Sequence, residues 1–285
     1  VGKTTLAATF ARPSQMGQVY YHDAERSGNN FVASLQQSSL QMKYVSLSDR
    51  FTDLPDSNDL LNRIVNGQMP WVDAKTRNGL IEYYEYILQD LNTNLNGQYT
   101  VYVMDTIERL EAGMAAWVDA HRKESGVTTT AHGRMWTEGV YPLYENLISS
   151  IHARGVKTVI FTSHLKTPWE NNRPVINKVV PSGKKILYLL SRFMIWLVKD
   201  GDNADGAPAG LILKERLAEY AIDNETDEWI VKRQLPQRIP HCTWQDIYYY
   251  LQNGCDLANP KPGEVMSSDE RELISELLTN KQMEL

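Results

Sequence analysis

The first residues of the chain combine a glycine, a lysine and two hydroxyls directly before a helical stretch. Val1-Gly2-Lys3-Thr4-Thr5 precedes LAATFA and matches the second half of the pattern GxxxxGK[ST]. In that loop, backbone N–H groups at a helix N-terminus hold phosphates, the lysine reaches the β and γ phosphates, and the hydroxyl binds Mg²⁺. We therefore expect Gly2, Lys3, Thr4 and Thr5 to bind ATP, with Thr4 as a ligand of Mg²⁺.

The first glycine of this pattern and the strand that normally precedes it do not occur in the chain. A match to the tripeptide GKT alone arises by chance in many chains of average composition. The match gains weight from the helix that follows and from the acidic strand ends further along. We expect the chain to begin inside its own phosphate-binding loop, and the complete protein to be more stable because the preceding strand belongs in the sheet interior.

Three apolar, strand-like runs end in polar residues that suit phosphoryl transfer. The run 99–105 ends in Asp105, which would hold Mg²⁺ through water, and the run 19–23 leads to Glu25, a candidate base for the attacking water. The run 157–163 leads to His164, which could hydrogen-bond a γ-phosphate. Each ending taken alone also fits an ordinary strand exit, a helix cap or a structural histidine. Their repetition indicates one shared site.

Strand-like and helix-like segments alternate along most of the chain, which predicts an α/β fold with a mostly parallel central sheet. The strand candidates are 19–23, 44–47, 100–105, 157–163, 193–199 and 210–216, and the helix candidates are 4–11, 59–66, 76–95, 107–123 and 141–154. The last two strands are joined by DGDNADGAPA, whose Gly, Asp and Pro content predicts a long hairpin. An antiparallel pair at the C-terminal edge of the sheet is the expected result.

Four motifs together resemble RecA-like P-loop ATPases, most of all the phage-type AAA/RecA-like recombination ATPases. They are GKTT, Asp23-Ala-Glu25, Met-Asp105-Thr and the Thr-Ser-His-Leu-Lys run at 162–166, and the resemblance covers about residues 1–216. It implies a three-layer RecA-like fold and the cofactors ATP and Mg²⁺. It also implies that Glu25 activates water and that His164 senses the γ-phosphate, at a position where RecA carries glutamine.

A late strand adds a second point of resemblance. Lys214-Glu-Arg216 is similar to the K-x-R finger that replicative helicases project into the ATP site of a neighbouring subunit. In a strand, positions two apart face the same side, so both cations could reach one phosphate. The resemblance implies a homo-oligomer, ring or filament, in which Lys214 and Arg216 act in trans. Exposed basic residues that protect an edge strand from aggregation remain the alternative.

The segment after His164 is basic in an otherwise acidic chain. Residues 164–192 hold six Lys or Arg against one acid, whereas the whole chain has a net charge of −6. Basic side chains combined with an aromatic ring are typical of single-strand binding. We expect single-stranded DNA as a partner, held by Lys166, Trp169, Arg173, Lys178, Lys184 and Lys185. A solvated loop is the alternative.

Length and composition limit the remaining options. A chain of 285 residues with 42% apolar residues supports one large core, predicted over 1–234 without its first strand, and a helical tail over 235–285. The tail has helix candidates at 243–252 and 268–280. No apolar run is long enough to cross a membrane, the first residues lack the ordered charged, apolar and small-residue regions of a signal peptide, and the two cysteines lack metal-ligand spacing. We expect a cytoplasmic protein, in the host cytoplasm if it is phage-encoded.

The leading hypothesis is an ATP-hydrolysing oligomer that acts on single-stranded DNA in phage-type recombination or replication. A nucleotide-switched scaffold or packaging accessory that binds proteins is the first alternative. A small-molecule kinase is the second, and it would need an acceptor pocket and a lid that the sequence does not mark. DNA-stimulated hydrolysis that weakens steeply with salt separates the first two hypotheses.

Overall fold

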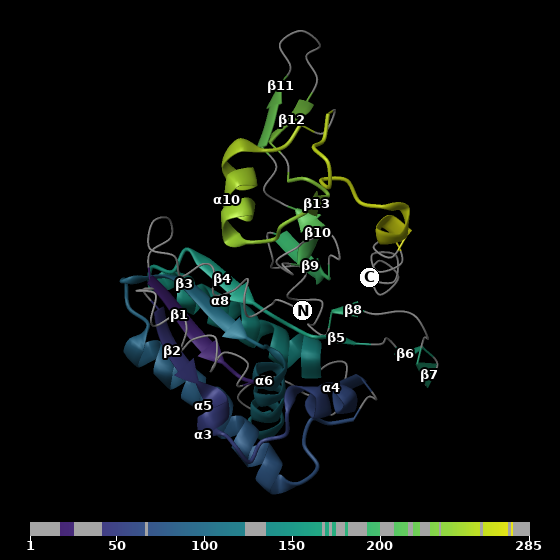
Figure 1. Cartoon of the computed structure of the whole chain (residues 1–285). Coiled ribbons are helices and arrows are strands. Elements are labelled where there is room, and N and C mark those ends of the chain that lie inside the picture. Colours follow the sequence, from purple (N-terminus) through teal and green to yellow (C-terminus); the bar gives the residue numbers. More distant parts are fainter. Residues whose placement is uncertain are drawn as a thin grey trace. The chain divides into compact units, whose positions relative to one another are not determined.

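The computed structural model describes residues 18–25, 42–65, 68–122, 135–166, 169–170, 173–174, 180–181, 193–199, 208–215, 219–222, 229–233, 235–256, 259–272 and 275. These residues belong to two compact units, 18–181 and 193–275 (Figure 1). The predicted helix at 4–11 lies outside them. Among the described helices, none combines the length and apolar character needed to cross a bilayer.

A four-stranded parallel sheet forms the centre of the first unit (Figure 1). Its strands are β1 (Gln18–Asp23), β2 (Met42–Ser46), β3 (Tyr99–Asp105) and β4 (Thr158–Phe161), in the order β2-β1-β3-β4. β1 pairs with both β2 and β3, and Asp23 lies opposite Asp105 in the register. The α/β class and the parallel central sheet are therefore confirmed.

The order of the strands explains where the helices lie. The chain moves from β2 past β1 to β3, and then onward to β4. Crossovers between parallel strands are right-handed, so two crossovers in the same direction place their helices on the same face of the sheet. The first crossover contains α3 (Leu47–Arg50), α4 (Ser57–Val65) and α5 (Ala74–Asn94), and the second contains α6 (Glu108–Ala120), the π-helical turn η1 (Met135–Val140) and α8 (Tyr141–Ala153).

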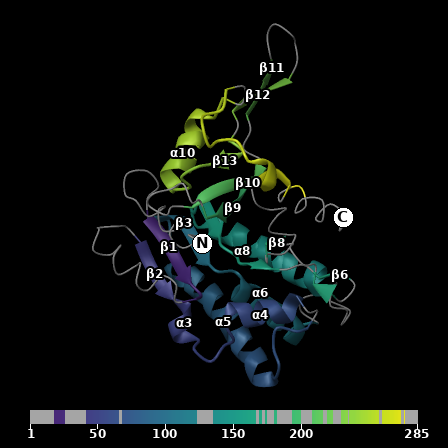
Figure 2. The same cartoon turned by 45° about the vertical axis from the view of Figure 1, so that its right-hand side comes forward.

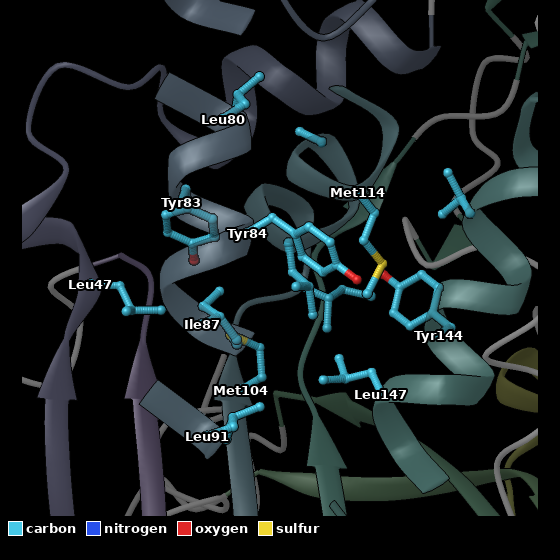
Figure 3. Close-up of a cluster of buried hydrophobic side chains, with 14 of the residues drawn as sticks. Leu47, Leu80, Tyr83, Tyr84, Ile87, Leu91, Met104, Met114, Tyr144 and Leu147 are labelled. Carbon is cyan, nitrogen blue, oxygen red and sulfur yellow. The ribbon is translucent and has the colours of Figure 1, made fainter. Parts of the chain in front are cut away.

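The side chains of these helices meet the sheet in one apolar core (Figure 3). Tyr83 and Ile87 of α5, Met104 of β3 and Tyr144 of α8 are fully buried, and Leu147 of α8 is nearly so. Burying a side chain such as Ile87 stabilises the fold by about 1.5–3 kcal/mol. The core fixes α5, α6 and α8 against the strands that carry the polar residues described below.

Helix α6 approaches α5 closely at Gly113. A Cβ atom at this position would lie 2.9 Å from the backbone carbonyl oxygen of Leu80 and 3.0 Å from Cβ of Tyr84, both on α5. Backbone atoms move only with the helix that contains them, so any larger residue would push the two helices apart. Glycine here sets the distance between α5 and α6.

Local caps set several element boundaries. The Ser46 side chain accepts a hydrogen bond from the backbone N–H of Asp49 at 3.4 Å, which starts α3 directly after β2. The sequence predicted Leu47 as the last residue of a strand, and this was wrong. Leu47 is the first residue of a helix. Asp73 caps α5 in the same way, with its carboxylate 2.7 Å from the backbone N–H of Thr76.

The second unit contains a separate antiparallel sheet (Figure 2). Its strands are β9 (Phe193–Val198), β10 (Ala209–Glu215) and β13 (Arg238–Ile239), in the order β13-β10-β9. The antiparallel pairing of β9 with β10 is confirmed. Within the described residues, however, β10 has β13 as its other neighbour, so the pair does not extend the parallel sheet. Strands β11 (Glu219–Ile222) and β12 (Trp229–Arg233) form a further pair.

Both predicted tail helices begin at reciprocal caps. Thr243 and Asp246 form a capping box at the start of α10 (Trp244–Asn253). Glu270 donates its backbone N–H to the Ser267 hydroxyl, and its carboxylate accepts the Ser267 N–H at 2.8 Å, where the second helix begins. Cys242, just before α10, is buried, and burial together with Asp246 raises the pKa of its thiol to about 12.

Candidate functional site

The carboxyl ends of β1 and β3 meet at the point where the strand order reverses. From β1 the chain continues outward to β2, whereas β3 lies on the other side of β1. The backbone N–H of Ala24 donates to the carbonyl of Asp105 at 2.6 Å, which joins the two strand ends. Open parallel sheets bind ligands in the crevice outside the strand ends at such a reversal. This edge of the sheet is therefore the candidate site.

Asp105 is held at this edge by two hydroxyl groups. The Tyr21 hydroxyl donates to one carboxylate oxygen of Asp105 at 2.7 Å, and the Thr162 hydroxyl donates to the other. Its side chain is almost completely buried, and the peptide bond that follows it is cis. The carboxylate has a fixed direction, to which a hydroxyl of β1 and a hydroxyl just after β4 contribute.

Asp23 shapes the turn that carries Glu25. One oxygen of the Asp23 carboxylate accepts the backbone N–H of Glu25 at 2.8 Å, and the other accepts the Tyr44 hydroxyl at 2.6 Å. Burial and the bond to Asp23 both raise the pKa of Tyr44 above its ordinary value. Asp23 is thus a buried acceptor that fixes the start of the turn.

Glu25, Glu108 and His164 come together from three different elements. Glu25 follows β1, Glu108 is the first residue of α6, and His164 follows β4. Nε2 of His164 lies 3.4 Å from a Glu25 oxygen, and Nδ1 lies 3.5 Å from Oε1 of Glu108. The same Oε1 accepts the backbone N–H of His164 at 2.7 Å. The side chains of Glu25 and His164 are 21% and 23% exposed, whereas Glu108 is sealed from solvent.

Arg109 connects the turn after β1 with the segment before α4. Its guanidinium donates to the carbonyl of Ala24 at 2.9 Å and to the carbonyl of Pro55 at 3.0 Å. A hollow of about 560 Å³ lies beside it, with Glu25 in its wall. The other polar groups of the wall include Ser48, Thr52, Asp56, Ser57, Asn58 and Asp59. The hollow is large enough for a small polar ligand next to Glu25.

The structure brings some of the predicted site residues together and leaves others outside its description. Glu25 and His164 are in direct contact, and Asp105 lies at the same edge of the sheet. Gly2, Lys3, Thr4, Thr5 and Arg216 lie outside the described residues. Lys214 belongs to β10 in the second unit. The register of β10 shifts between Ile212 and Lys214, ahead of the Lys214–Arg216 pair, so the prediction that these two cations face the same side stays a prediction.

The basic segment after His164 contains two short antiparallel pairings. β5 (Leu165–Lys166) pairs with β8 (Val180–Pro181), and β6 (Trp169–Glu170) pairs with β7 (Arg173–Pro174). The second pairing lies within the sequence span of the first, and the described residues of 165–181 are together called the hairpin after β4. Lys166, Trp169 and Arg173 have their backbones in this hairpin. Lys178, Lys184 and Lys185 lie outside the described residues.

A second polar network lies between the sheet and helix α5, and sequence reasoning missed it. Asp90 of α5 accepts the Tyr20 hydroxyl at 2.5 Å and contacts Nε2 of His22 at 2.9 Å. Nδ1 of His22 lies 2.9 Å from the Tyr102 hydroxyl, and Asn94 donates to the other Asp90 oxygen at 2.8 Å. Desolvation by burial lowers the pKa of His22. A neutral imidazole therefore accepts from Tyr102 and donates to Asp90.

Glu108 is a further residue that the sequence analysis did not select. It follows Asp105 by three positions, in the first turn of the helix that begins after β3. An acid in a first helical turn is common because it favours the helix dipole, so its type alone gave no signal. The usable signal was its distance from a strand end, since the first turn after such an end lies at the ligand edge of the sheet.

No family model matches this sequence, and a search of curated proteins finds no significant match. What can be said of the chain's activity therefore rests on the geometry of its own residues.

Proposed function

We propose that the chain is an ATP-hydrolysing, RecA-like protein that acts on single-stranded DNA. The observation that carries the proposal is the convergence of Glu25, Asp105 and His164 at the strand reversal of a parallel sheet. These are the residues whose types suggested a base, a metal-associated carboxylate and a sensor. Their sequence positions are far apart, so their meeting at one edge is what a phosphoryl-transfer site requires.

Each residue has a defined task in this proposal. Lys3 and Thr4 would hold the terminal phosphates of ATP and Mg²⁺, and Asp105 would bind the ion through water. Glu25, partly exposed and fixed at its backbone by Asp23, would take the proton of the attacking water. His164 would contact the γ-phosphate. Mg²⁺ would supply charge stabilisation to the transferred phosphoryl group.

The hairpin after β4 supports a role for DNA. It begins one residue after His164, so a movement of His164 on loss of the γ-phosphate would act directly on the first residues of the hairpin. It carries Lys166, Trp169 and Arg173, which offer charge and an aromatic face to single-stranded DNA. This connection would let the nucleotide state alter DNA affinity in phage-type recombination or replication.

The proposal is tested by nucleotide and DNA binding in one set of variants. Lys3→Ala should lose ATP binding, measured by fluorescence of a labelled ATP analogue. Lys166→Ala with Arg173→Ala should bind ATP normally but lose DNA-stimulated hydrolysis, and Lys75→Ala, on the exposed surface of α5, is the control for the loss of a surface lysine. Stimulation of the wild type should fall steeply as salt rises. Unchanged ATP binding by Lys3→Ala would reject the proposal.

Action in trans by Lys214 and Arg216 needs a separate test. Arg216→Ala subunits should be inactive alone, as should Glu25→Gln subunits. Mixing them should restore activity, because some interfaces would combine an intact base with an intact Arg216. Absence of recovery at every mixing ratio would argue against a shared site between subunits.

The hollow beside Glu25 favours a small-molecule kinase as the second candidate function. A kinase needs an acceptor pocket next to its base, and this hollow has polar walls and includes Glu25. In that case Glu25 would take the proton of an acceptor hydroxyl instead of water. Hydrolysis of ATP by the purified chain without any added acceptor favours the ATPase, whereas turnover that requires a hydroxyl compound favours the kinase.

A further inference from the structure

We propose that Glu25, Glu108 and His164 form a binding site for one divalent transition-metal ion, with Zn²⁺ favoured, separate from the Mg²⁺ that would accompany ATP. The three residues each offer one ligand atom, and these atoms lie within 4.8 Å of one another. Ligand atoms around a tetrahedral ion at about 2.1 Å lie about 3.4 Å apart. Inward movements of less than about 1 Å would therefore close the site.

The donor set selects the class of ion. Two carboxylate oxygens and one imidazole nitrogen suit Zn²⁺ and related transition metals, whereas Mg²⁺ and Ca²⁺ prefer oxygen ligands alone. An imidazole binds an ion through one ring nitrogen, and Nε2 of His164 is the nitrogen on the Glu25 side. Three protein ligands leave a coordination position for water.

The ligands are held by the surrounding structure before any ion binds. Glu108 is fully buried in the first turn of α6, and the backbone N–H of His164 fixes one of its oxygens at 2.7 Å. Hydrogen bonds of this kind hold ligating carboxylates in known metal sites. On the other side, Asp23 holds the backbone N–H of Glu25 and Arg109 holds the carbonyl of Ala24.

An ion could reach the site from the partly exposed side. The side chains of Glu25 and His164 are each about one-fifth exposed, and Glu25 also lines the hollow. The carboxylates of Glu25 and Glu108 place two negative charges close together, and of the two only Glu108 is sealed from water. A cation held between them would offset that charge, which is the usual condition for keeping carboxylates buried together.

The proposal is tested by calorimetric titration of the nucleotide-free chain with Zn²⁺. We expect one ion per chain, and more than about 100-fold weaker binding in Glu108→Gln and in His164→Gln, because loss of a merely supporting residue already costs about 10–100-fold. Glu111→Gln is the matched control, since Glu111 is a buried acid in the same helix and no member of the three. It should bind Zn²⁺ as the wild type does.

Thermal unfolding supplies a second readout. Zn²⁺ should raise the midpoint of the wild type and of Glu111→Gln, and should leave the midpoints of Glu108→Gln and His164→Gln unchanged. Circular dichroism shows whether each variant is folded. If Glu108→Gln does not fold, His164→Gln still decides the question, because it replaces a partly exposed side chain.

Two outcomes would overturn the metal site. One is the absence of any binding tighter than about 1 mM, a free energy near −4 kcal/mol. The other is binding that persists unchanged in Glu108→Gln and His164→Gln, which would place the ion elsewhere. Titration without nucleotide keeps this test independent of ATP hydrolysis, and Lys3→Ala should still bind Zn²⁺. In the wild type, a bound ion would occupy Glu25 and should inhibit hydrolysis.

Discussion

Two histidines of the first unit lie between oxygen-bearing partners, but in opposite surroundings. His22 points under the sheet, is completely buried, and contacts Asp90 and Tyr102 at 2.9 Å each. His164 lies at the carboxyl edge, is partly exposed, and has a carboxylate facing each ring nitrogen. The first arrangement is closed to solvent, and the second is reachable by a ligand.

The difference teaches how a structural network is separated from a candidate site. All partners of the His22 network belong to β1, β3 and α5, which already pack together in the core. The residues of the His164 cluster lie just after β1, in the first turn of α6 and just after β4, at the carboxyl edge of the sheet. Residue types are similar in the two places, so exposure and position on the sheet decide the interpretation. Substitutions in the His22 network should therefore lower stability and leave activity unchanged, whereas substitutions at the sheet edge should lower activity and leave stability unchanged.

The largest expected effect is on catalysis at the sheet edge. Glu25→Gln should slow ATP hydrolysis by about 10²–10⁴-fold, because the amide takes up no proton from water. ATP binding and the free energy of unfolding should stay near their wild-type values. Steady-state hydrolysis and urea unfolding measure the two effects, and Glu85→Gln, an exposed acid of α5, is the control. Normal hydrolysis by Glu25→Gln would mean that another residue is the base.

The next effect is on stability under the sheet. Asp90→Ala should lower the free energy of unfolding by about 3 kcal/mol, because Tyr20, His22 and Asn94 would lose their shared acceptor inside the core. Hydrolysis per folded molecule should not change. Urea unfolding checks the first part, and a loss below about 0.5 kcal/mol would show that water can replace the carboxylate.

Much of the fold could be predicted because its signals are local. The apolar runs ending at Asp23 and Asp105 predicted two strands of the sheet within a residue, and the tail helix predicted from residue 243 begins in the structure at the Thr243 cap. Leu47 was misplaced because an apolar residue after a strand fits either element. Only the hydrogen bond at Ser46 settles that it is helical.

The site was partly predictable for a different reason. Glu25 and His164 follow strand ends, and the parallel topology brings such ends to one edge. Glu108 and Asp90 are both in helices, where an acid is ordinary, and only tertiary packing places them beside histidines. The pairing of β10 with β13 also depends on contacts between distant segments, which sequence periodicity does not encode.

The pH dependence of stability should reveal His22. The folded protein resists protonation of this buried ring, because desolvation lowers its pKa below the ordinary value of 6.5. The unfolded chain therefore binds an extra proton below pH 6.5. The contribution of a neutral His22 to the free energy of unfolding should be fully present above pH 6.5. It should fall as the pH decreases, by up to about 1.4 kcal/mol per pH unit. Urea unfolding at pH 7, 6 and 5 measures the slope, which should flatten in His22→Gln.

Asp90 adds a second loss at lower pH. Burial alone would raise its pKa, but hydrogen bonds from His22 and Tyr20 outweigh burial and bring it to about 2 from 3.8. The stability from this carboxylate is present above pH 3.8 and is lost as the pH falls through about 2. Asp90→Asn should remove this lower window. An equal slope in His22→Gln and the wild type between pH 7 and 5 would assign the upper window to another group.

The smallest expected effect is the change in the free energy of unfolding when His164, the histidine at the sheet edge, is replaced. His164→Gln should change the free energy of unfolding by less than about 0.5 kcal/mol, as expected for a partly exposed side chain outside the core. His22→Gln, the same substitution under the sheet, should cost several times more. Urea unfolding of the two variants side by side tests the contrast directly, and equal losses would erase the distinction between the two regions.

The close contact at Gly113 links the interior of the helical layer to chemistry at its end. Gly113 is five residues along α6 from Glu108, about 7.5 Å at the rise of an α-helix. A methyl group at Gly113 would tilt or shift helix α6, whose first turn carries Glu108 and Arg109. The distance between α5 and α6 thus sets where Glu108 lies at the sheet edge. A substitution at Gly113, which contacts neither Glu108 nor His164, should therefore change the distance between these two side chains.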